Sequence, residues 1–225
     1  MTMELDDAGA QRRHVLSVFD FDGTLTRYDS FVPFLKFAFG TREFSRSILR
    51  FALPSVRFLA RRFNRDELKA QLICTFLTGV DVKWLQDRCE KFCGLFWVQL
   101  MRPSGLKSVA VEEEAGVVVT LGSASPALIL QPFADRLGIK VIGTELELED
   151  GLLTERMTGN NCRCENKVLR LEAVYGSLGQ YRLKAWGDTR GDFELLAAAQ
   201  EAYWRNFHPA WCRLRLRADR SGNGA

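Results

Sequence analysis

Two aspartates, Asp20 and Asp22, follow directly after an apolar run in the stretch "FDFDGTLT". Residues two apart on a strand face the same side, so both carboxylates can converge on one point. Like charges this close repel each other unless a positive group binds between them. A D-x-D pair before glycine is also a common turn, so the pair alone does not distinguish a turn from a reactive site.

A second acidic pair, Asp188 and Asp192, follows another apolar run in "WGDTRGD". The two residues are four apart and share one face if a helix begins there. Carboxylates at strand ends suit a hard cation with oxygen ligands, Mg²⁺ in particular. Acidic residues are also favoured in the first turn of any helix, so a solvated helix start is the alternative.

Two further residues gain interest from their order along the chain. Ser123 in "LGSASP" can offer a hydroxyl and neighbouring backbone N–H groups to an anion, although helix capping alone also explains it. Lys167 in "GNNCRCENKVLRL" falls on a predicted helix, where a single lysine is ordinarily a surface residue.

Short apolar runs alternate with helical patterns along the chain, which predicts an α/β fold with a doubly wound parallel sheet. An Asp150-Gly151 pair between alternating apolar and charged residues predicts a small β-hairpin. The predicted strands are 15–19, 117–121, 139–142, 183–186 and 202–207, and the predicted helices are 126–137, 165–178 and 192–202.

A long segment without strand patterns separates the first two predicted strands. Its helix-start signals lie at Asp29 or Ser30, Thr41, 64–67 and Asp81. We therefore expect an all-helical cap at 28–104, inserted into a discontinuous core of 1–27 and 105–225. Such an insertion can cover the carboxyl ends of the strands, where open α/β sheets bind ligands.

The order of these motifs resembles that of the haloacid dehalogenase (HAD) superfamily, over about residues 15–209. The helical insertion and the "GNNC…K" stretch upstream of "GDTRGD" resemble its phosphoserine-phosphatase-like branch. The stretches "FDFDGTLTRYDSF" and "GNNCRCENK" are also similar to bacterial phosphatidylglycerophosphatases of this branch.

The resemblance implies a phosphatase reaction and a role for each aspartate. Asp20 would attack phosphorus and become an aspartyl phosphate. Asp22 would protonate the leaving oxygen and then deprotonate the attacking water. Mg²⁺ would be held by Asp20, the main-chain carbonyl of Asp22 and Asp188. Asp192 would anchor either the metal's waters or Lys167.

The resemblance also implies which groups hold the phosphoryl oxygens. These are Ser123 and Lys167, with the amides of Gly23 and Thr24, while the Thr24 hydroxyl has a structural role as its alternative. Cys164 stands where relatives often have glycine, which puts the shape of this loop in question.

The composition is that of an ordinary globular protein, with 225 residues, 47% apolar and 26% charged. A net charge of +3 gives no reason to expect a nucleic-acid partner. The first residues are partly acidic and without an apolar segment, so we do not expect them to act as a signal peptide. The uncharged run 115–134 breaks at "GSASP", which favours a strand, loop and helix start over a spanning helix. We therefore expect a cytoplasmic protein. Six cysteines lack framework spacing and predict free thiols: Cys74, Cys89, Cys93, Cys162, Cys164 and Cys212.

The predicted cap is strongly basic, with nine basic and three acidic residues between Lys36 and Lys69. Phenylalanines alternate with the arginines: Phe37, Phe39, Phe44, Phe51, Phe58 and Phe63. Basic residues with exposed aromatics suit peripheral contact with an anionic membrane, here at its inner face. The alternative is that the phenylalanines form the core of the cap and the arginines attract any phosphate.

Three functions are therefore compatible with the sequence. The first is a Mg²⁺-dependent phosphomonoesterase acting on a lipid phosphate such as phosphatidylglycerophosphate. The second is a small-metabolite phosphatase of the phosphoserine or sugar-phosphate type. Asp29 stands where phosphoserine phosphatases carry glutamate, which argues against phosphoserine itself. The third is a non-catalytic protein that binds a phosphate ligand.

Overall fold

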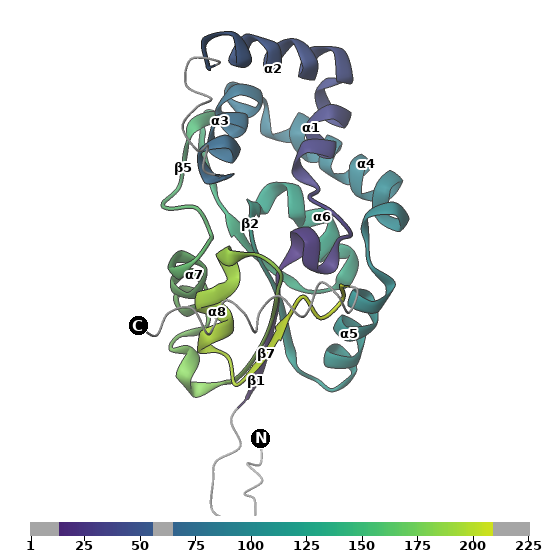
Figure 1. The fold of residues 1–225 in the computed structure, drawn as a ribbon, viewed down its shortest axis with the longest axis vertical. Coiled ribbons are helices and arrows are strands. Elements are labelled where there is room, and N and C mark those ends of the chain that lie inside the picture. The colour runs from purple at the N-terminus through teal and green to yellow at the C-terminus, as the bar shows by residue number, and fades with distance from the viewer. Residues whose placement is uncertain (1–13, 56–64, 209–225) are drawn as a thin grey trace, which may run out of the picture.

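A five-stranded parallel sheet forms the centre of the protein (Figure 1). The computed structural model describes residues 14–55 and 65–208. The strands are ordered β3-β2-β1-β6-β7, and every neighbouring pair is parallel. They comprise Val15–Phe19 (β1), Val118–Pro126 (β2), Lys140–Thr144 (β3), Arg182–Gly187 (β6) and Glu201–Trp204 (β7). The predicted α/β fold with a parallel sheet is confirmed.

The alternation of side chains along β1 explains why helices cover both faces of the sheet. Leu16 and Val18 join one buried cluster with residues of α7 (Glu165–Tyr175) and α8 (Phe193–Ala198). Phe19 points the other way, into a second cluster that includes α6 (Ala127–Leu137). The first strand is therefore buried on both sides, and its apolar run ends where the polar site begins.

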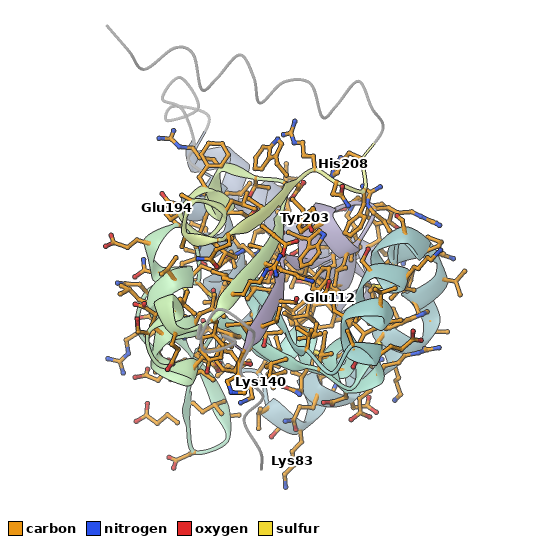
Figure 2. All side chains as sticks on the ribbon, turned by 90° about the horizontal axis from the view of Figure 1, so that it is seen from below. Lys83, Glu112, Lys140, Glu194, Tyr203 and His208 are labelled. Carbon is orange, nitrogen blue, oxygen red and sulfur yellow. The ribbon has the colours of Figure 1, made fainter. Side chains whose placement is uncertain are left out.

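Helix α5 (Pro103–Glu114) was not recognised in the sequence and packs beside the sheet. Its Glu112 carboxylate accepts hydrogen bonds from Ser17 Oγ at 2.8 Å and Lys184 Nζ at 2.9 Å. In Figure 2, Glu112 and Tyr203 lie near the centre of the view, whereas Lys83 extends away from it. Glu112 is buried but paired, so its role is structural.

Of the described helices between β1 and β2, those that precede α5 gather at one end of the molecule (Figure 1). They are Phe31–Phe39 (α1), Thr41–Ser55 (α2), Arg65–Leu77 (α3) and Val82–Leu100 (α4). Asp81 caps α4 by accepting a hydrogen bond from the Trp84 amide at 2.8 Å, as predicted. The exact boundaries of a cap and a core remain a prediction, and position 104 lies inside α5.

The phenylalanines of this segment pack among its helices where the structure describes them. Phe37 contacts the Phe92 and Phe96 rings, while Phe39 and Phe44 both contact Phe76. Phe58, Phe63 and the side chain of Phe51 lie outside what is described. The start signal at 64–67 coincides with the first described residue of α3, Arg65. The three described rings are therefore core residues rather than exposed membrane contacts.

The chain enters and leaves the helical segment at one place. Thr26 and Met101 form an antiparallel bridge, the Arg27 amide donates to Leu100 O, and the Arg102 amide donates to Leu25 O, each at 2.8 Å. The Arg102 guanidinium adds a bond from Nε to Thr26 O at 2.9 Å. The two connections therefore form a short paired hinge.

The predicted hairpin is present as β4 (Leu146–Glu149) and β5 (Leu152–Met157), with Asp150 and Gly151 at φ 50° and 81° in the turn. It is bonded to the helical segment, since Leu153 O accepts from the Gly79 amide at 2.7 Å.

Two boundaries near the C-terminus differ from the prediction. The helix expected over 192–202 is the shorter α8, and the strand expected over 202–207 is Glu201–Trp204. Asp192 ends a 3₁₀ turn, Arg190–Asp192, so its side chain is available to the site. Cys74, Cys89, Cys93 and Cys162 are free thiols, and Cys212 lies outside the described residues. Within the described ranges, each helix is too short or too polar to cross a membrane.

Candidate active site

Three aspartates meet at the carboxyl ends of β1 and β6. Phe19 pairs with Trp186 in adjacent parallel strands, so the residues that follow these strands emerge side by side. One oxygen each of Asp20, Asp188 and Asp192 lies within 4.8 Å of the other two. The sequence prediction that these carboxylates lie together agrees with this geometry.

Lys167 on α7 is the buried cation of this cluster. Its side chain is 2% exposed, and Nζ lies 2.9 Å from Asp20 Oδ1 and also contacts Asp192 Oδ1. Burial alone lowers the pKa of the ammonium, but the charges of Asp192 and Asp20 outweigh it and raise the pKa above its ordinary value. Lys167 therefore remains charged beside Asp20.

Both carboxylate oxygens of Asp192 are engaged, one by the turn that follows β6 and the other by Lys167. Its Oδ2 accepts from the Thr189 amide and hydroxyl, each at 3.0 Å, and from the Asp188 amide at 3.2 Å. Its Oδ1 accepts from Lys167. Of its two predicted roles, this geometry favours the anchoring of Lys167.

Asp188 and Asp20 are the carboxylates with capacity for a cation. Burial, followed by the charge of Asp192, raises the pKa of Asp188 to about 6 and that of Asp20 well above its ordinary value. Lys167 pairs with two of the three carboxylates, Asp20 and Asp192, whereas Asp188 lies 3.6 Å from the His208 ring nitrogen. Oxygen ligands and uncompensated negative charge fit a hard divalent cation such as Mg²⁺.

The turn Phe21–Leu25 brings the backbone against Asp188. Gly23 has φ 82°, and a Cβ there would lie 2.4 Å from Asp188 Oδ2. The Thr24 hydroxyl donates to Asp188 Oδ1 at 3.3 Å, which is a structural role. The Gly23 amide donates to Thr26 Oγ1 at 3.0 Å, so its predicted contact with a phosphoryl oxygen would require this bond to be given up.

Asp22 has different partners from the Lys167 cluster. Its Oδ1 accepts hydrogen bonds from the amide and hydroxyl of Ser30, each at 2.7 Å. Its Oδ2 accepts from the Ser125 hydroxyl, which in turn accepts from Lys69 Nζ at 2.7 Å. The second aspartate therefore faces the helical segment, and its side chain is not part of the three-carboxylate cluster.

Ser123 lies in β2, beyond the predicted strand end at 121, and Cys164 directly precedes α7. Ser123 is buried, and its hydroxyl accepts from the Ser125 amide at 3.2 Å. Cys164, at the start of α7, has φ 53° and ψ −133°, a conformation that glycine adopts far more readily. Its amide donates to Gly191 O at 2.8 Å, so the loop keeps the shape that a glycine would allow.

A cavity of about 570 Å³ opens above the carboxylates. Asp20, Asp22, Asp188 and Ser123 line its floor, and residues of α1 and α3 line the opposite wall. These wall residues are Phe31, Val32, Leu68, Lys69 and Leu72. The helical segment thus encloses space over the reactive groups, as expected for a cap.

Several site residues escaped the sequence interpretation. Lys69 was counted only as part of the basic charge and Ser30 only as a helix start. Ser125 had no signal beyond its proximity to Ser123. His208, whose Nε2 lies 2.8 Å from Gly23 O, belongs to no motif. Their roles depend on contacts between distant segments.

The fold and site define a protein with a parallel α/β core whose strand ends carry clustered aspartates beneath a helical cover. The family of haloacid dehalogenase-like hydrolases matches residues 17–197, most of the chain, and the chain belongs to this family. Protein CicA of Caulobacter vibrioides is 40% identical over 196 residues, which are 86% of each chain.

Solved structures are similar in fold. A protein of unknown function from Bordetella pertussis Tohama I has a TM-score of 0.75 at 22% identity, covering 93% of this chain and 96% of that one. A substrate-bound phosphoserine phosphatase has a TM-score of 0.57 at 16% identity, covering 84% of each chain. At these identities the likeness concerns the fold alone.

Proposed function

We propose that the protein is a Mg²⁺-dependent phosphomonoester hydrolase that works through an aspartyl phosphate on Asp20. The observation that carries this proposal is the Asp20 carboxylate, held by buried Lys167 on the floor of the cavity. A carboxylate at a fixed position beside a buried cation suits nucleophilic attack on a dianionic phosphoryl group.

Each step then has a group to perform it. Asp20 forms a bond to phosphorus while the ester P–O bond breaks, and Asp22 gives a proton to the departing alcohol oxygen. Asp22 next takes a proton from a water that attacks phosphorus, which releases phosphate and regenerates Asp20. Lys167 and Ser123 hold the phosphoryl oxygens throughout.

A divalent cation fits the oxygens of Asp20 and Asp188, with the Asp22 main-chain carbonyl as the third predicted ligand. When bound, Mg²⁺ neutralises phosphoryl charge and offsets the repulsion between the carboxylates. A structural neighbour described as a phospho-aspartyl intermediate analogue of phosphoserine phosphatase supports this chemistry on the same fold, at a TM-score of 0.54 and 16% identity.

We infer that the substrate is a lipid phosphate of the phosphatidylglycerophosphate type. The supporting observations are the similarity of two motif stretches to that subgroup and the basic charge between Lys36 and Lys69. Asp29 caps α1, because its Oδ1 accepts from the Phe31 amide at 3.0 Å. Asp29 also stands where phosphoserine phosphatases carry glutamate, which supports a substrate other than phosphoserine.

A phosphate-release screen tests the function. Wild-type protein and Asp20→Asn are assayed with Mg²⁺ against lipid and water-soluble monoesters, and again with a chelator. We expect release from at least one monoester, at least a thousandfold loss in the variant because the nucleophile is gone, and loss with chelator. Turnover by the variant within about tenfold of wild type would contradict the role of Asp20. Release from soluble esters alone would refute the lipid substrate.

A further inference from the structure

Lys69 of α3 reaches the reactive groups across the cavity. Its Nζ lies 2.7 Å from Ser125 Oγ and 4.0 Å from Asp22 Oδ2, and the Ser125 hydroxyl donates to that same Asp22 oxygen. We propose that Lys69, acting through Ser125, is a positioning residue that orients the Asp22 carboxyl. Proton transfer by Asp22 then depends on the position of α3 over the cavity. The inference rests on the proposed phosphatase function.

The direction of this hydrogen-bond chain follows from the donors available. An ammonium only donates, whereas a serine hydroxyl has one hydrogen and two lone pairs. Lys69 therefore occupies a lone pair of Ser125 Oγ, and the single hydrogen of that hydroxyl is left for Asp22. Without Lys69, the Ser125 hydroxyl can rotate toward another acceptor.

The remaining contacts fix both ends of the chain. Asp22 Oδ1 is held by the amide and hydroxyl of Ser30, at the start of α1, each at 2.7 Å. The Lys69 ammonium also lies 5.4 Å from the centre of the Phe31 ring, a cation–π contact. Both oxygens of Asp22 therefore have partners. Ser30, which precedes α1, binds Oδ1, and Ser125, itself bound by Lys69 of α3, binds Oδ2.

This arrangement has a chemical consequence that substrate binding alone would lack. Proton donation matters most when the departing alcohol is a poor leaving group, and least when it leaves as a stable anion. A residue that orients the donor should therefore matter far more for alkyl than for activated aryl esters. A residue that only binds substrate charge should instead alter KM.

The test compares Lys69→Met and Ser125→Ala on an alkyl phosphomonoester and on p-nitrophenyl phosphate. Each variant should lose about tenfold or more in kcat on the alkyl ester, within the range known for acid–base catalysis, and less than about threefold on the aryl ester. Lys69→Arg should recover part of the alkyl activity, because a guanidinium also donates to Ser125. Lys91→Met is the matched control, because Lys91 is an exposed helical lysine paired with Asp87.

The double variant gives an independent criterion. Because both residues act through one chain, the combined loss in kcat should not exceed that of the worse single variant. Multiplicative losses, equal losses on both esters, or a change in KM alone would each overturn the inference while leaving the phosphatase function intact. Wild-type protein that hydrolyses neither ester would overturn both. Thermal unfolding checks each variant, and if Lys69→Met is unfolded, Ser125→Ala decides the question by the same ester comparison.

Discussion

Lys167 lies between two aspartates that come from different parts of the chain, with Nζ 2.9 Å from Asp20 Oδ1 and in contact with Asp192 Oδ1. Asp20 directly follows β1, and Asp192 belongs to the turn after β6. One buried ammonium therefore joins Asp20, the proposed nucleophile, to the loop that carries Asp188. We expect stability and chemistry to depend on the same contact.

Lys167→Met should both inactivate and destabilise the protein. Removing one partner of a buried charge group leaves the other charges unpaired, which typically costs about 3–5 kcal/mol of unfolding free energy. Urea unfolding at neutral pH measures this loss, with the exposed Lys91→Met as the control. A loss below about 1 kcal/mol, the usual size for surface pairs, would contradict the buried pairing.

Gly23→Ala should abolish activity, and Gly40→Ala is its matched control. Both glycines have positive φ, 82° and 83°, so alanine is strained at either position, although their ψ angles of −21° and 148° differ. A Cβ at Gly23 would lie 2.4 Å from Asp188 Oδ2, whereas nothing lies within 4 Å at Gly40. Both variants should be less stable than wild type, but only Gly23→Ala should lose kcat, by at least a hundredfold, because only there does the new Cβ displace Asp188. Equal activities would show that the close approach to Asp188 is unimportant.

The metal-free protein should lose stability as pH rises from about 4 to 7. Burial raises the folded-state pKa of Asp188 from 3.8 to about 6, so folding favours its protonated form. That contribution is fully present below the unfolded pKa and is lost as pH rises through the folded pKa, at a cost of roughly 3 kcal/mol at most. The pKa of Asp20 is raised in the same direction.

Chemical denaturation at several pH values, with chelator and then with Mg²⁺, measures this trend. Added Mg²⁺ should reverse it, because a bound cation favours the carboxylate form. Asp188→Asn should show a shallower pH dependence, since all other titrating groups are common to both proteins. Identical slopes in the two proteins would contradict the raised pKa.

Cys164→Gly should stabilise the protein by about 1 kcal/mol with unchanged kcat. Its φ of 53° and ψ of −133° carry a strain of the order of 1–3 kcal/mol, which exceeds the entropy that glycine adds to the unfolded chain. Cys164→Ala removes the thiol but keeps the strain, so it separates the two effects. Greater stability of the alanine than of the glycine variant would exclude strain as the cause.

Replacing Arg57, Arg61 and Arg62 together by serine tests whether the protein binds anionic membranes, as a lipid substrate would require. These arginines lie outside the described residues, so the expectation rests on charge alone. At about 1 kcal/mol for each arginine, association with anionic vesicles should weaken roughly a hundredfold. Co-sedimentation with anionic and neutral vesicles measures it, with Lys91→Met again as control. Wild-type protein that sediments with neither vesicle type would refute the membrane contact.

The sequence predicted best what is local and repeated. The apolar run before Asp20 marked β1 to the residue, because a strand buried on both faces must be apolar throughout. The order of the aspartates and Lys167 indicated one site, because the ends of parallel strands meet at one edge. Helix α5 was missed because its buried residues are Gly105, Val109 and Glu112, and only one of these has a large apolar side chain, so no regular apolar spacing marks the helix.

The contacts of Asp22 could not be predicted, for a different physical reason. They join Lys69, Ser125 and Ser30, which are brought together only by the packing of α1 and α3 over the sheet. No local pattern distinguishes Lys69 from the other basic residues of its segment. Only three-dimensional proximity gives it a role.

Because Thr26 and Met101 form a bridge, the chain leaves and re-enters the core at one place, and the helical segment is an insertion between these residues. The register of β1 against β2 therefore does not depend on the length or the sequence of the helical segment. A lineage can lengthen, shorten or exchange the helical segment while Asp20 and Lys167, which lie outside it, keep their places. Because Lys69 lies inside it, such an exchange would alter the proposed positioning of Asp22 together with the cavity wall, and these two features would change at one evolutionary rate while Asp20 and Lys167 change at another.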